Sequence, residues 1–170
     1  CRPGAGDLVL VGGYCGADRS LRLLDPWSGC VHCVLDAHES RPTGAALSAS
    51  GRLVSVDEGG ELIVWTPSDS VSAMKSWRIV ARAQLMPAID RTAGNMTATL
   101  CVSCGRLIAT IDRVWATKTA FGLTKERASD AKSMIAVQFW DVDGASPNAL
   151  RTALIDIDGY QPYASDAVFI

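Results

Sequence analysis

The stretch Gly59-Gly60-Glu61-Leu62-Ile63-Val64-Trp65 places a strand after a glycine turn and ends it on a tryptophan. The same sequence pattern recurs at Ala136-Val137-Gln138-Phe139-Trp140-Asp141. It recurs again, with leucine in place of tryptophan, at Ser20-Leu21-Arg22-Leu23-Leu24-Asp25. A second sequence pattern precedes two of these strands, as Ser-Gly-Arg-Leu-Val-Ser at 50–55 and as Cys-Gly-Arg-Leu-Ile-Ala at 104–109. Repeated strand–turn–strand units indicate an array of similar sheets.

Short alternating or apolar runs separated by Gly, Asp, Ser and Pro dominate the chain, and signals for long helices are weak. This pattern predicts an all-β fold. Leu24 and Trp65 lie about 40 residues apart, which matches the length of one four-stranded propeller blade. The expected strands are residues 8–12, 21–24, 30–35, 45–48, 52–56, 61–65, 77–83, 97–103, 106–111, 134–142 and 149–155.

The strands group into units at roughly residues 1–36, 37–84 and 85–158, and residues 159–170 resemble the start of a further blade. We expect residues 112–133 to be an insertion of loop or helix that lengthens the third unit. Closed propellers have about four to eight blades, so about three units predict a single partial β-propeller. We expect the remaining blades in the same protein or in a partner chain. The chain starts with Cys rather than Met, which favours a position inside a longer protein.

The composition is that of a globular domain rather than a disordered segment. A chain of 170 residues is long enough to bury one hydrophobic core. Its residues are 48% hydrophobic and 20% charged, which is typical of globular domains. With 16 basic and 18 acidic residues, the net charge is −2, so no electrostatic signal for nucleic acid or an anionic membrane surface is present. The apolar runs are too short to span a bilayer. We therefore expect a cytoplasmic chain that inserts into no membrane and binds no nucleic acid.

The middle unit begins with Ala37-His38, carries Ser55 on its second strand and closes its third strand with Trp65. In these residues the chain resembles the WD40-repeat β-propeller family. Repeats of that family tend to carry Gly-His near the start, Ser or Thr on the second strand, Asp in the following turn and Trp-Asp at the end of the third. The family's side chains form a hydrogen-bonded set that pins the blade, and the resemblance gives this role to His38, Ser55 and Trp65. Gly59 stands where the turn aspartate is expected.

The other two units keep less of the family pattern. The first retains Asp18 but has Leu24 in place of tryptophan, and the third closes with Trp140 and Asp141. The resemblance implies a blade-pinning role for Asp18, Trp140 and Asp141. Large trafficking proteins with a BEACH domain often end in such degenerate propellers, so a propeller of that type is one expectation.

Two Cys-x-x-Cys pairs, Cys30/Cys33 and Cys101/Cys104, have a spacing found in zinc sites. The first pair falls within a predicted strand, where residues three apart point to opposite faces and cannot share one ion. We expect the cysteines to be reduced and to pack as small apolar side chains. A catalytic role for His38 would need a nucleophile poised beside it, whereas the family pattern gives His38 a bond to Ser55 that pins the blade. We therefore expect no catalytic residue, no metal and no cofactor.

Candidates for partner binding lie in loops, which commonly carry function on a rigid scaffold. Aromatic and arginine side chains are typical anchors of protein interfaces. The candidates from the insertion and from the turn after Pro26 are Trp115, Phe121, Arg113, Lys125, Arg127 and Trp27. The structural alternative for the insertion is that its aromatic residues fold back against the rim of the propeller.

These observations predict a non-catalytic scaffold for protein–protein interaction that binds other proteins through its rim and loops. The first alternative is a structural subunit of a large multi-protein assembly, such as a trafficking, ciliary or organellar ribosome complex. The second alternative is an enzyme built on a propeller. An enzyme would need carboxylates or histidines on the channel strands at 45–48 and 97–103, which offer almost none.

Overall fold

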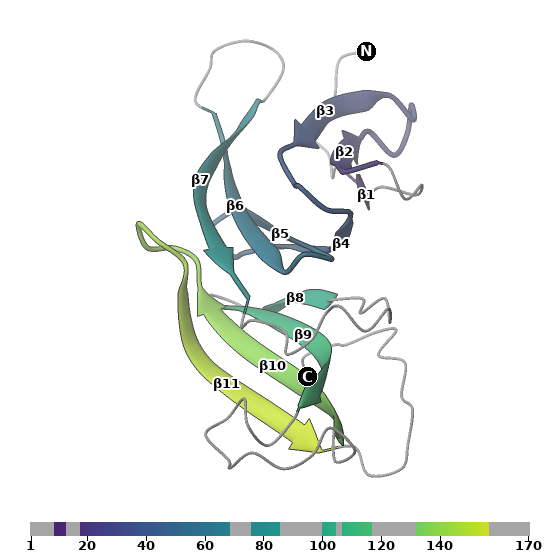
Figure 1. Ribbon diagram of the computed structural model, residues 1–170. Coiled ribbons are helices and arrows are strands. Elements are labelled where there is room, and N and C mark those ends of the chain that lie inside the picture. Colours follow the sequence, from purple (N-terminus) through teal and green to yellow (C-terminus); the bar gives the residue numbers. More distant parts are fainter. Residues whose placement is uncertain are drawn as a thin grey trace.

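The computed structural model describes residues 9–12, 18–68, 76–85, 100–104, 107–116 and 132–156. These residues form three antiparallel sheets that follow one another in chain order (Figure 1). The described segments consist of strands and turns and contain no helix, which confirms the predicted all-β class. Within the same segments there is accordingly no helix of the length and hydrophobicity needed to cross a membrane.

Consecutive strands lie next to one another in every sheet. The first sheet has the order β1-β2-β3, the middle sheet β4-β5-β6-β7 and the third sheet β11-β10-β9-β8. Antiparallel neighbours of this kind need only short turns between them. The strands are β1 Val9–Gly12, β2 Ser20–Leu24, β3 Val31–Asp36, β4 Pro42–Leu47, β5 Leu53–Asp57, β6 Glu61–Pro67, β7 Trp77–Gln84, β8 Leu100–Cys104, β9 Leu107–Ala116, β10 Lys132–Asp141 and β11 Asn148–Asp156.

The hairpin of β9 and β10 is longer than the sequence predicts. Ala116 pairs with Lys132 and Trp115 with Ser133, so both ends of the segment 112–133 are strand rather than insertion. We expected residues 112–133 to be an insertion, but antiparallel pairing joins backbone groups and continues through Arg113 and Lys132. Residues 117–131 lie outside the described part of the chain.

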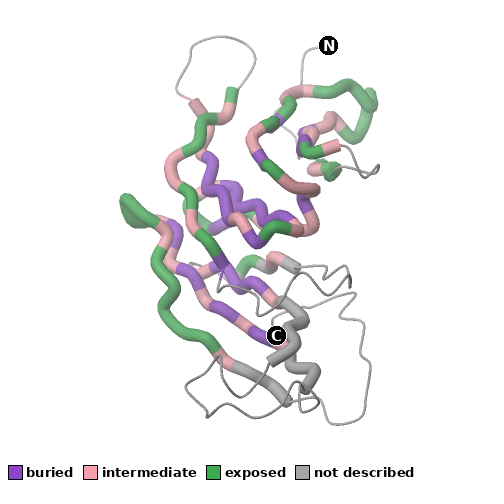
Figure 2. The backbone as a smooth tube through the Cα atoms, viewed as in Figure 1, coloured by how far each residue is buried: buried purple, intermediate pink, exposed green. Residues whose placement is uncertain are grey.

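The middle sheet is covered on both faces, because successive side chains of a strand point to opposite sides. On one face, Val54 and Val64 belong to a buried cluster with Ile108 and Trp140 of the third sheet. On the other face, Trp65 belongs to a cluster with residues of the first sheet. Figure 2 shows the buried residues concentrated on β5 and β6. Sheets that pack face to face in series are the arrangement of propeller blades.

The contact between the first and middle sheets is built from large aliphatic and aromatic side chains. Leu21 and Leu35 of the first sheet meet Leu53, Ile63 and Trp65 of the middle sheet, and all five are buried. Each such side chain contributes about 1.5–3 kcal/mol when it is fully buried. Burial on both faces explains why Leu62, Ile63, Val64 and Trp65 of β6 are apolar in succession.

Polar contacts tie the middle sheet to the third sheet at one end of the strands. Arg52 donates from Nη1 to the carbonyl oxygens of Val142 and Gly144, at 2.6 and 2.8 Å. Ser50 Oγ donates to Asp143 Oδ1 at 2.5 Å. These residues lie in the β4–β5 turn and in the β10–β11 turn, so the two sheets are held together at their turns as well as through their apolar faces.

Candidate functional site

A buried hydrogen-bond network joins the loop before β4 to strands β5 and β6. His38 Nε2 lies 2.7 Å from Ser55 Oγ, and Trp65 Nε1 donates to the same oxygen at 2.8 Å. His38 Nδ1 lies 3.2 Å from Asp57 Oδ2. His38, Ser55 and Asp57 have at most 4% of their surface exposed. The structure therefore brings together His38, Ser55 and Trp65, the three residues singled out in the middle unit.

The partners of His38 determine the direction of each hydrogen bond. An ionised carboxylate only accepts, so His38 Nδ1 carries the proton and donates to Asp57. In the neutral ring, Nε2 then accepts from the hydroxyl of Ser55, whose oxygen accepts from the indole N–H of Trp65. The chain of bonds from Trp65 to Asp57 leaves none of these groups unsatisfied, which is what buried polar groups require.

Asp57 is the member of the network that the sequence interpretation missed. Its carboxylate also accepts from the backbone N–H groups of Ser40, at 3.3 Å, and Glu61, at 2.8 Å. The expectation that Gly59 replaces the turn aspartate is wrong, because Asp57 occupies that role at the start of the turn. The available signal was its position: an aspartate that opens a turn commonly accepts from backbone N–H groups a few residues on.

The hydrogen bonds of Asp57 determine its ionisation. Burial raises the pKa of this carboxyl group, but the hydrogen bonds from His38, from the N–H of Glu61 and from the N–H of Ser40 lower it. The net effect places the pKa of Asp57 below its ordinary value. Asp57 is therefore an ionised acceptor at neutral pH.

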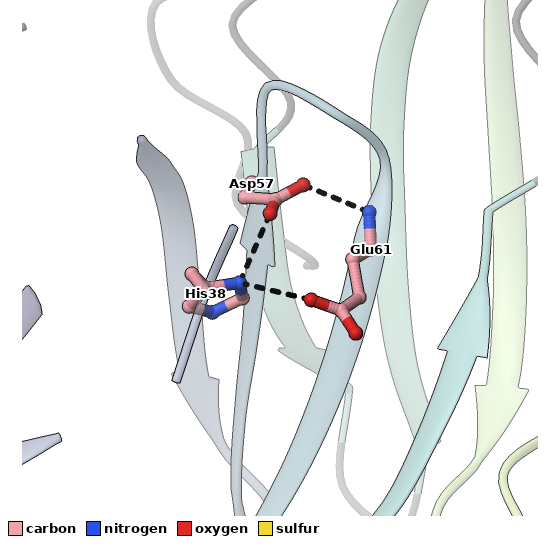
Figure 3. Close-up of side chains that lie close together, drawn as sticks. All are labelled: His38, Asp57 and Glu61. Carbon is pink, nitrogen blue, oxygen red and sulfur yellow. Dashed lines mark hydrogen bonds and ion pairs between the residues drawn. The ribbon is translucent and has the colours of Figure 1, made fainter. Parts of the chain in front are cut away.

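Glu61 and Arg82 extend the network toward the surface. Glu61 Oε2 lies 3.9 Å from His38 Nδ1, and no donor among the described residues reaches this oxygen. Arg82 forms an ion pair with the other oxygen of Glu61 and donates to the carbonyl oxygen of Ala37 at 3.0 Å. Figure 3 shows the side chains of His38, Asp57 and Glu61 converging at the start of β6.

His38, Asp57 and Glu61 are also the residue types that bind transition metals, and their ligand atoms lie within 4.8 Å of one another. A metal on His38 Nδ1 would require loss of the proton that this nitrogen donates to Asp57. The hydrogen bond between His38 and Asp57 already fixes the loop before β4 against the β5–β6 turn.

The third sheet repeats one half of this network. Trp140 Nε1 donates to Thr110 Oγ1 at 3.1 Å, and both residues are buried. Asp141 Oδ1 accepts from the backbone N–H of Asp143 at 3.1 Å, so this aspartate stabilises the following turn. Asp112 stands two residues after Thr110, as Asp57 stands two residues after Ser55, but its side chain lies outside the described residues.

In the first sheet, Asp18 holds the beginning of β2. Its carboxylate accepts from the backbone N–H of Ser20 at 3.1 Å and from the Ser20 hydroxyl at 2.7 Å, and it forms an ion pair with Arg22 at 2.6 Å. The hydrogen bonds from Ser20 and Arg22 lower the pKa of Asp18 to about 2. Asp18 thus contacts residues of β2, the strand that follows it, and does not join the His38 network.

Trp27 lies at the tip of the β2–β3 turn with 92% of its surface exposed. Asp25 stabilises this turn: its Oδ1 accepts from the N–H of Trp27 at 2.9 Å, its Oδ2 from the hydroxyl of Ser28 at 2.8 Å, and its carbonyl oxygen from the N–H of Gly29 at 2.8 Å. Gly29 adopts a φ of 67°, which a glycine tolerates without strain. The same hydrogen bonds lower the pKa of Asp25. The result is an ordered turn that presents an aromatic ring to solvent.

The other predicted binding residues are placed only in part. Arg113 and Trp115 lie on β9, and their side chains are outside the described residues. Phe121, Lys125 and Arg127 fall in the segment that the structure does not describe.

The described cysteines differ in their surroundings. Cys30 is exposed beside the start of β3, and Cys33 is half-buried against the middle sheet. Cys101 packs against the cluster between the middle and third sheets, and burial raises the pKa of its thiol to about 12. A thiol with such a pKa stays protonated at neutral pH and is a poor nucleophile.

The fold and the network define a partial WD40-like β-propeller: antiparallel sheets of three or four strands packed in series, with a tryptophan, a hydroxyl group, a histidine and an aspartate joined in the middle sheet. The crystal structure of Sqt1 from Saccharomyces cerevisiae is similar to this chain with a TM-score of 0.54 and 15% identity, over 88% of this chain and 33% of Sqt1. The structure of the Dos1 propeller aligns with a TM-score of 0.47 and 16% identity, over 83% of this chain and 32% of that one.

The similarity to Sqt1 supports the propeller fold that was predicted from the sequence, and it does so at low sequence identity. The chain spans about a third of each of the two solved structures. No family model matches the chain, and no curated protein matches it in sequence.

Proposed function

We propose that this chain is a non-catalytic scaffold that forms part of a WD40-like propeller and binds other proteins through the turns at the ends of its strands. The observation that carries the proposal is the ordered turn that exposes Trp27. An indole buries about 150–250 Å² in a contact, and tryptophan is enriched among the residues that dominate binding energy. Because Asp25 already fixes the turn, binding there would cost little conformational entropy.

The described polar groups favour a structural over a catalytic role. The titratable residues that come together, His38 and Asp57, are buried and bonded to each other and to Ser55. No substrate could reach them without opening the loop before β4. The net charge of −2 gives no electrostatic signal for nucleic acid or an anionic membrane surface, so proteins are the expected partners. The cytoplasm is the proposed location.

The test uses the 170-residue chain as bait in a cell extract, followed by titration calorimetry with the partner identified. Trp27→Ala is compared with Leu47→Ala, which also truncates an exposed apolar residue but leaves the turn intact. We expect Trp27→Ala to weaken binding at least about tenfold, equivalent to about 1.4 kcal/mol, and Leu47→Ala to bind as the wild type does. If both variants bound the partner with the affinity of the wild type, Trp27 would not be part of the binding surface.

A structural subunit of a larger assembly is the second candidate, and exposed valines on the first sheet favour it. Val9, Val31 and Val34 are each more than 45% exposed. Apolar side chains gathered on one sheet face are unusual on a monomer surface and mark contact sites. A propeller of the BEACH-protein type is a narrower form of this candidate, which the presence of a BEACH domain in the same gene product would test.

A further inference from the structure

One carboxylate oxygen of the His38 network is buried and has no hydrogen-bond donor among the described residues. This atom is Glu61 Oε2, and the other oxygen of the same carboxylate pairs with Arg82. A buried carboxylate oxygen without a donor is unfavourable, because an ionised group removed from water needs a hydrogen bond or a cation. Glu61 Oε2 lies 3.9 Å from His38 Nδ1, the nitrogen that also contacts Asp57. A cation bound between these three side chains would satisfy it.

The three side chains supply a set of ligand atoms that suits a divalent transition metal. His38 offers an imidazole nitrogen, and Asp57 and Glu61 each offer a carboxylate oxygen, all within 4.8 Å of one another (Figure 3). Ligands of a tetrahedral zinc ion lie about 2.0–2.2 Å from the metal and hence roughly 3.3 Å from one another. His38 Nδ1 lies 3.2 Å from Asp57 Oδ2 and 3.9 Å from Glu61 Oε2. A small inward rotation of the Glu61 side chain would therefore bring all three atoms to ligand distance.

The groups behind these ligands orient them as the outer shell of a metal site does. A histidine that binds a metal usually donates its other ring N–H to a neighbouring acceptor. His38 Nε2 lies 2.7 Å from Ser55 Oγ, so the neutral ring can carry its proton there and leave Nδ1 free for a metal. Asp57 is held by the backbone N–H groups of Ser40 and Glu61. Metal binding thus needs a shift of the ring proton from Nδ1 to Nε2 and a rotation of the Ser55 hydroxyl, with no change in the charge of the ring.

Charge and exposure favour the entry of a cation from the side of Glu61. The side chains of His38 and Asp57 are buried, whereas that of Glu61 is 22% exposed and that of Arg82 is 41% exposed. Two carboxylates lie beside a single guanidinium group, so these side chains carry one net negative charge when His38 is neutral. A divalent cation would reverse this charge while it satisfies the buried oxygen.

We infer that His38 Nδ1, Asp57 and Glu61 bind Zn²⁺ or a similar divalent transition metal, with one nitrogen and two oxygen ligands. The metal joins the loop before β4 to the start of β6, and three protein ligands leave a fourth position for water. From the sequence we expected no metal, because the contact of Glu61 with His38 arises only when this loop folds over the strand. The inference goes beyond the proposed function and does not depend on the Trp27 turn.

The test is calorimetric titration of the chelator-treated chain with Zn²⁺, which the wild type should bind. Glu61→Gln keeps the shape of the side chain and removes a ligand charge. It should weaken zinc binding at least about a hundredfold, beyond the effect of about 10–100-fold that is typical of outer-shell changes. Glu58→Gln is the matched control, because it removes a glutamate of the same turn that is ion-paired with Arg41 and is 34% exposed. This control should bind zinc as the wild type does.

The titration has two results that would overturn the inference. The first is a folded wild-type chain that binds no zinc. The second is an equal affinity of Glu61→Gln and Glu58→Gln for zinc, with both variants folded by circular dichroism, since the metal would then not depend on Glu61. Binding of a partner through Trp27 is measured separately, so either proposal can fail alone.

Cobalt spectroscopy and nuclear magnetic resonance separate this site from metal bound by cysteine. Co²⁺ held by nitrogen and oxygen shows visible d–d bands, whereas a bound thiolate adds an intense charge-transfer band. The wild type should show d–d bands that disappear in Glu61→Gln, and zinc should move the ring proton of His38 from Nδ1 to Nε2. Cobalt bands that depend on cysteine rather than on Glu61, or a proton that stays on Nδ1 in the zinc-loaded chain, would contradict the site.

Discussion

The middle sheet and the first sheet carry different residues at the same register positions. The middle sheet has Trp65 and Ser55, buried and hydrogen-bonded, where the first sheet has Leu24 and Val11. The middle sheet is covered on both faces, whereas Val11 is 39% exposed. A sheet of this fold therefore forms without the polar network, and alternating aliphatic side chains are sufficient for its strands to pair.

In the middle sheet, the polar network fixes the position of the loop before β4. His38 belongs to neither strand that it contacts, and its bonds to Ser55 and Asp57 fix the segment between β3 and β4. The first sheet has no such contact in the described residues, since Asp18 bonds within its own strand. The network therefore fixes the segment that leads from the first sheet into the middle sheet.

The largest effect is expected from truncation at the tryptophan position. Trp65→Ala should lower the free energy of unfolding by about 3–5 kcal/mol, because it empties the contact between the first and middle sheets and removes a partner of Ser55. Leu24→Ala, the same position in the first sheet, should cost well below half as much. Urea denaturation of both variants measures the two free energies of unfolding. Equal losses of this free energy would show that the first sheet is covered as fully as the middle one.

A smaller loss is expected from the carboxylate of the network. Asp57→Ala should destabilise the fold by roughly 2–4 kcal/mol, because His38 and two backbone N–H groups lose their acceptor in a buried site. Asp18→Ala removes a carboxylate with as many donors before β2 of the first sheet, and its effect should be much smaller because solvent replaces those bonds. Thermal unfolding of the two variants measures the difference. A larger loss for Asp18→Ala would mean that the first sheet depends more on its polar contacts.

The pH dependence of stability should show the same contrast in a weaker form. The folded pKa of Asp57 is lowered, so its contribution is complete above the ordinary value of 3.8 and disappears as the pH falls through the folded pKa. Below pH 4, the wild type should therefore lose stability more steeply than Asp57→Asn. Urea midpoints at a series of pH values measure the slopes, and parallel slopes would contradict the ionised acceptor.

The smallest effect on stability is expected at Trp27. Because 92% of this residue is exposed, Trp27→Ala should change the free energy of unfolding by less than about 0.5 kcal/mol. The same urea experiment measures it. A loss of several kcal/mol would show that the indole packs against the sheet and is not presented to a partner.

Much of the fold could be predicted from the sequence because strand and turn signals are local. The sequence pattern that ends on Trp65, with its repeat at Trp140, predicted the all-β class and the succession of strands. The extent of β9 and β10 could not be predicted, because the length of a hairpin depends on pairing between segments separated by residues 117–131. The sequence signal of a charged residue such as Arg113 is the same in a loop and in a strand.

The candidate site was predictable in three of its four residues. His38, Ser55 and Trp65 follow from the family pattern, whereas Asp57 was assigned to an ordinary turn. Its role depends on the loop before β4 folding over the β5–β6 turn, and no local pattern contains that contact. Burial of the neighbouring Glu61 oxygen depends on the same long-range contact.

The central claim is that Trp65 of the middle sheet is buried against the first sheet while its indole N–H is bonded to Ser55. Nuclear Overhauser effects from the Trp65 ring, together with exchange of its indole proton, test this claim most directly. The structure predicts cross-peaks to the methyl groups of Leu21 and Leu35 and slow exchange of the indole proton. Rapid exchange of that proton and no cross-peaks to the first sheet would contradict the account.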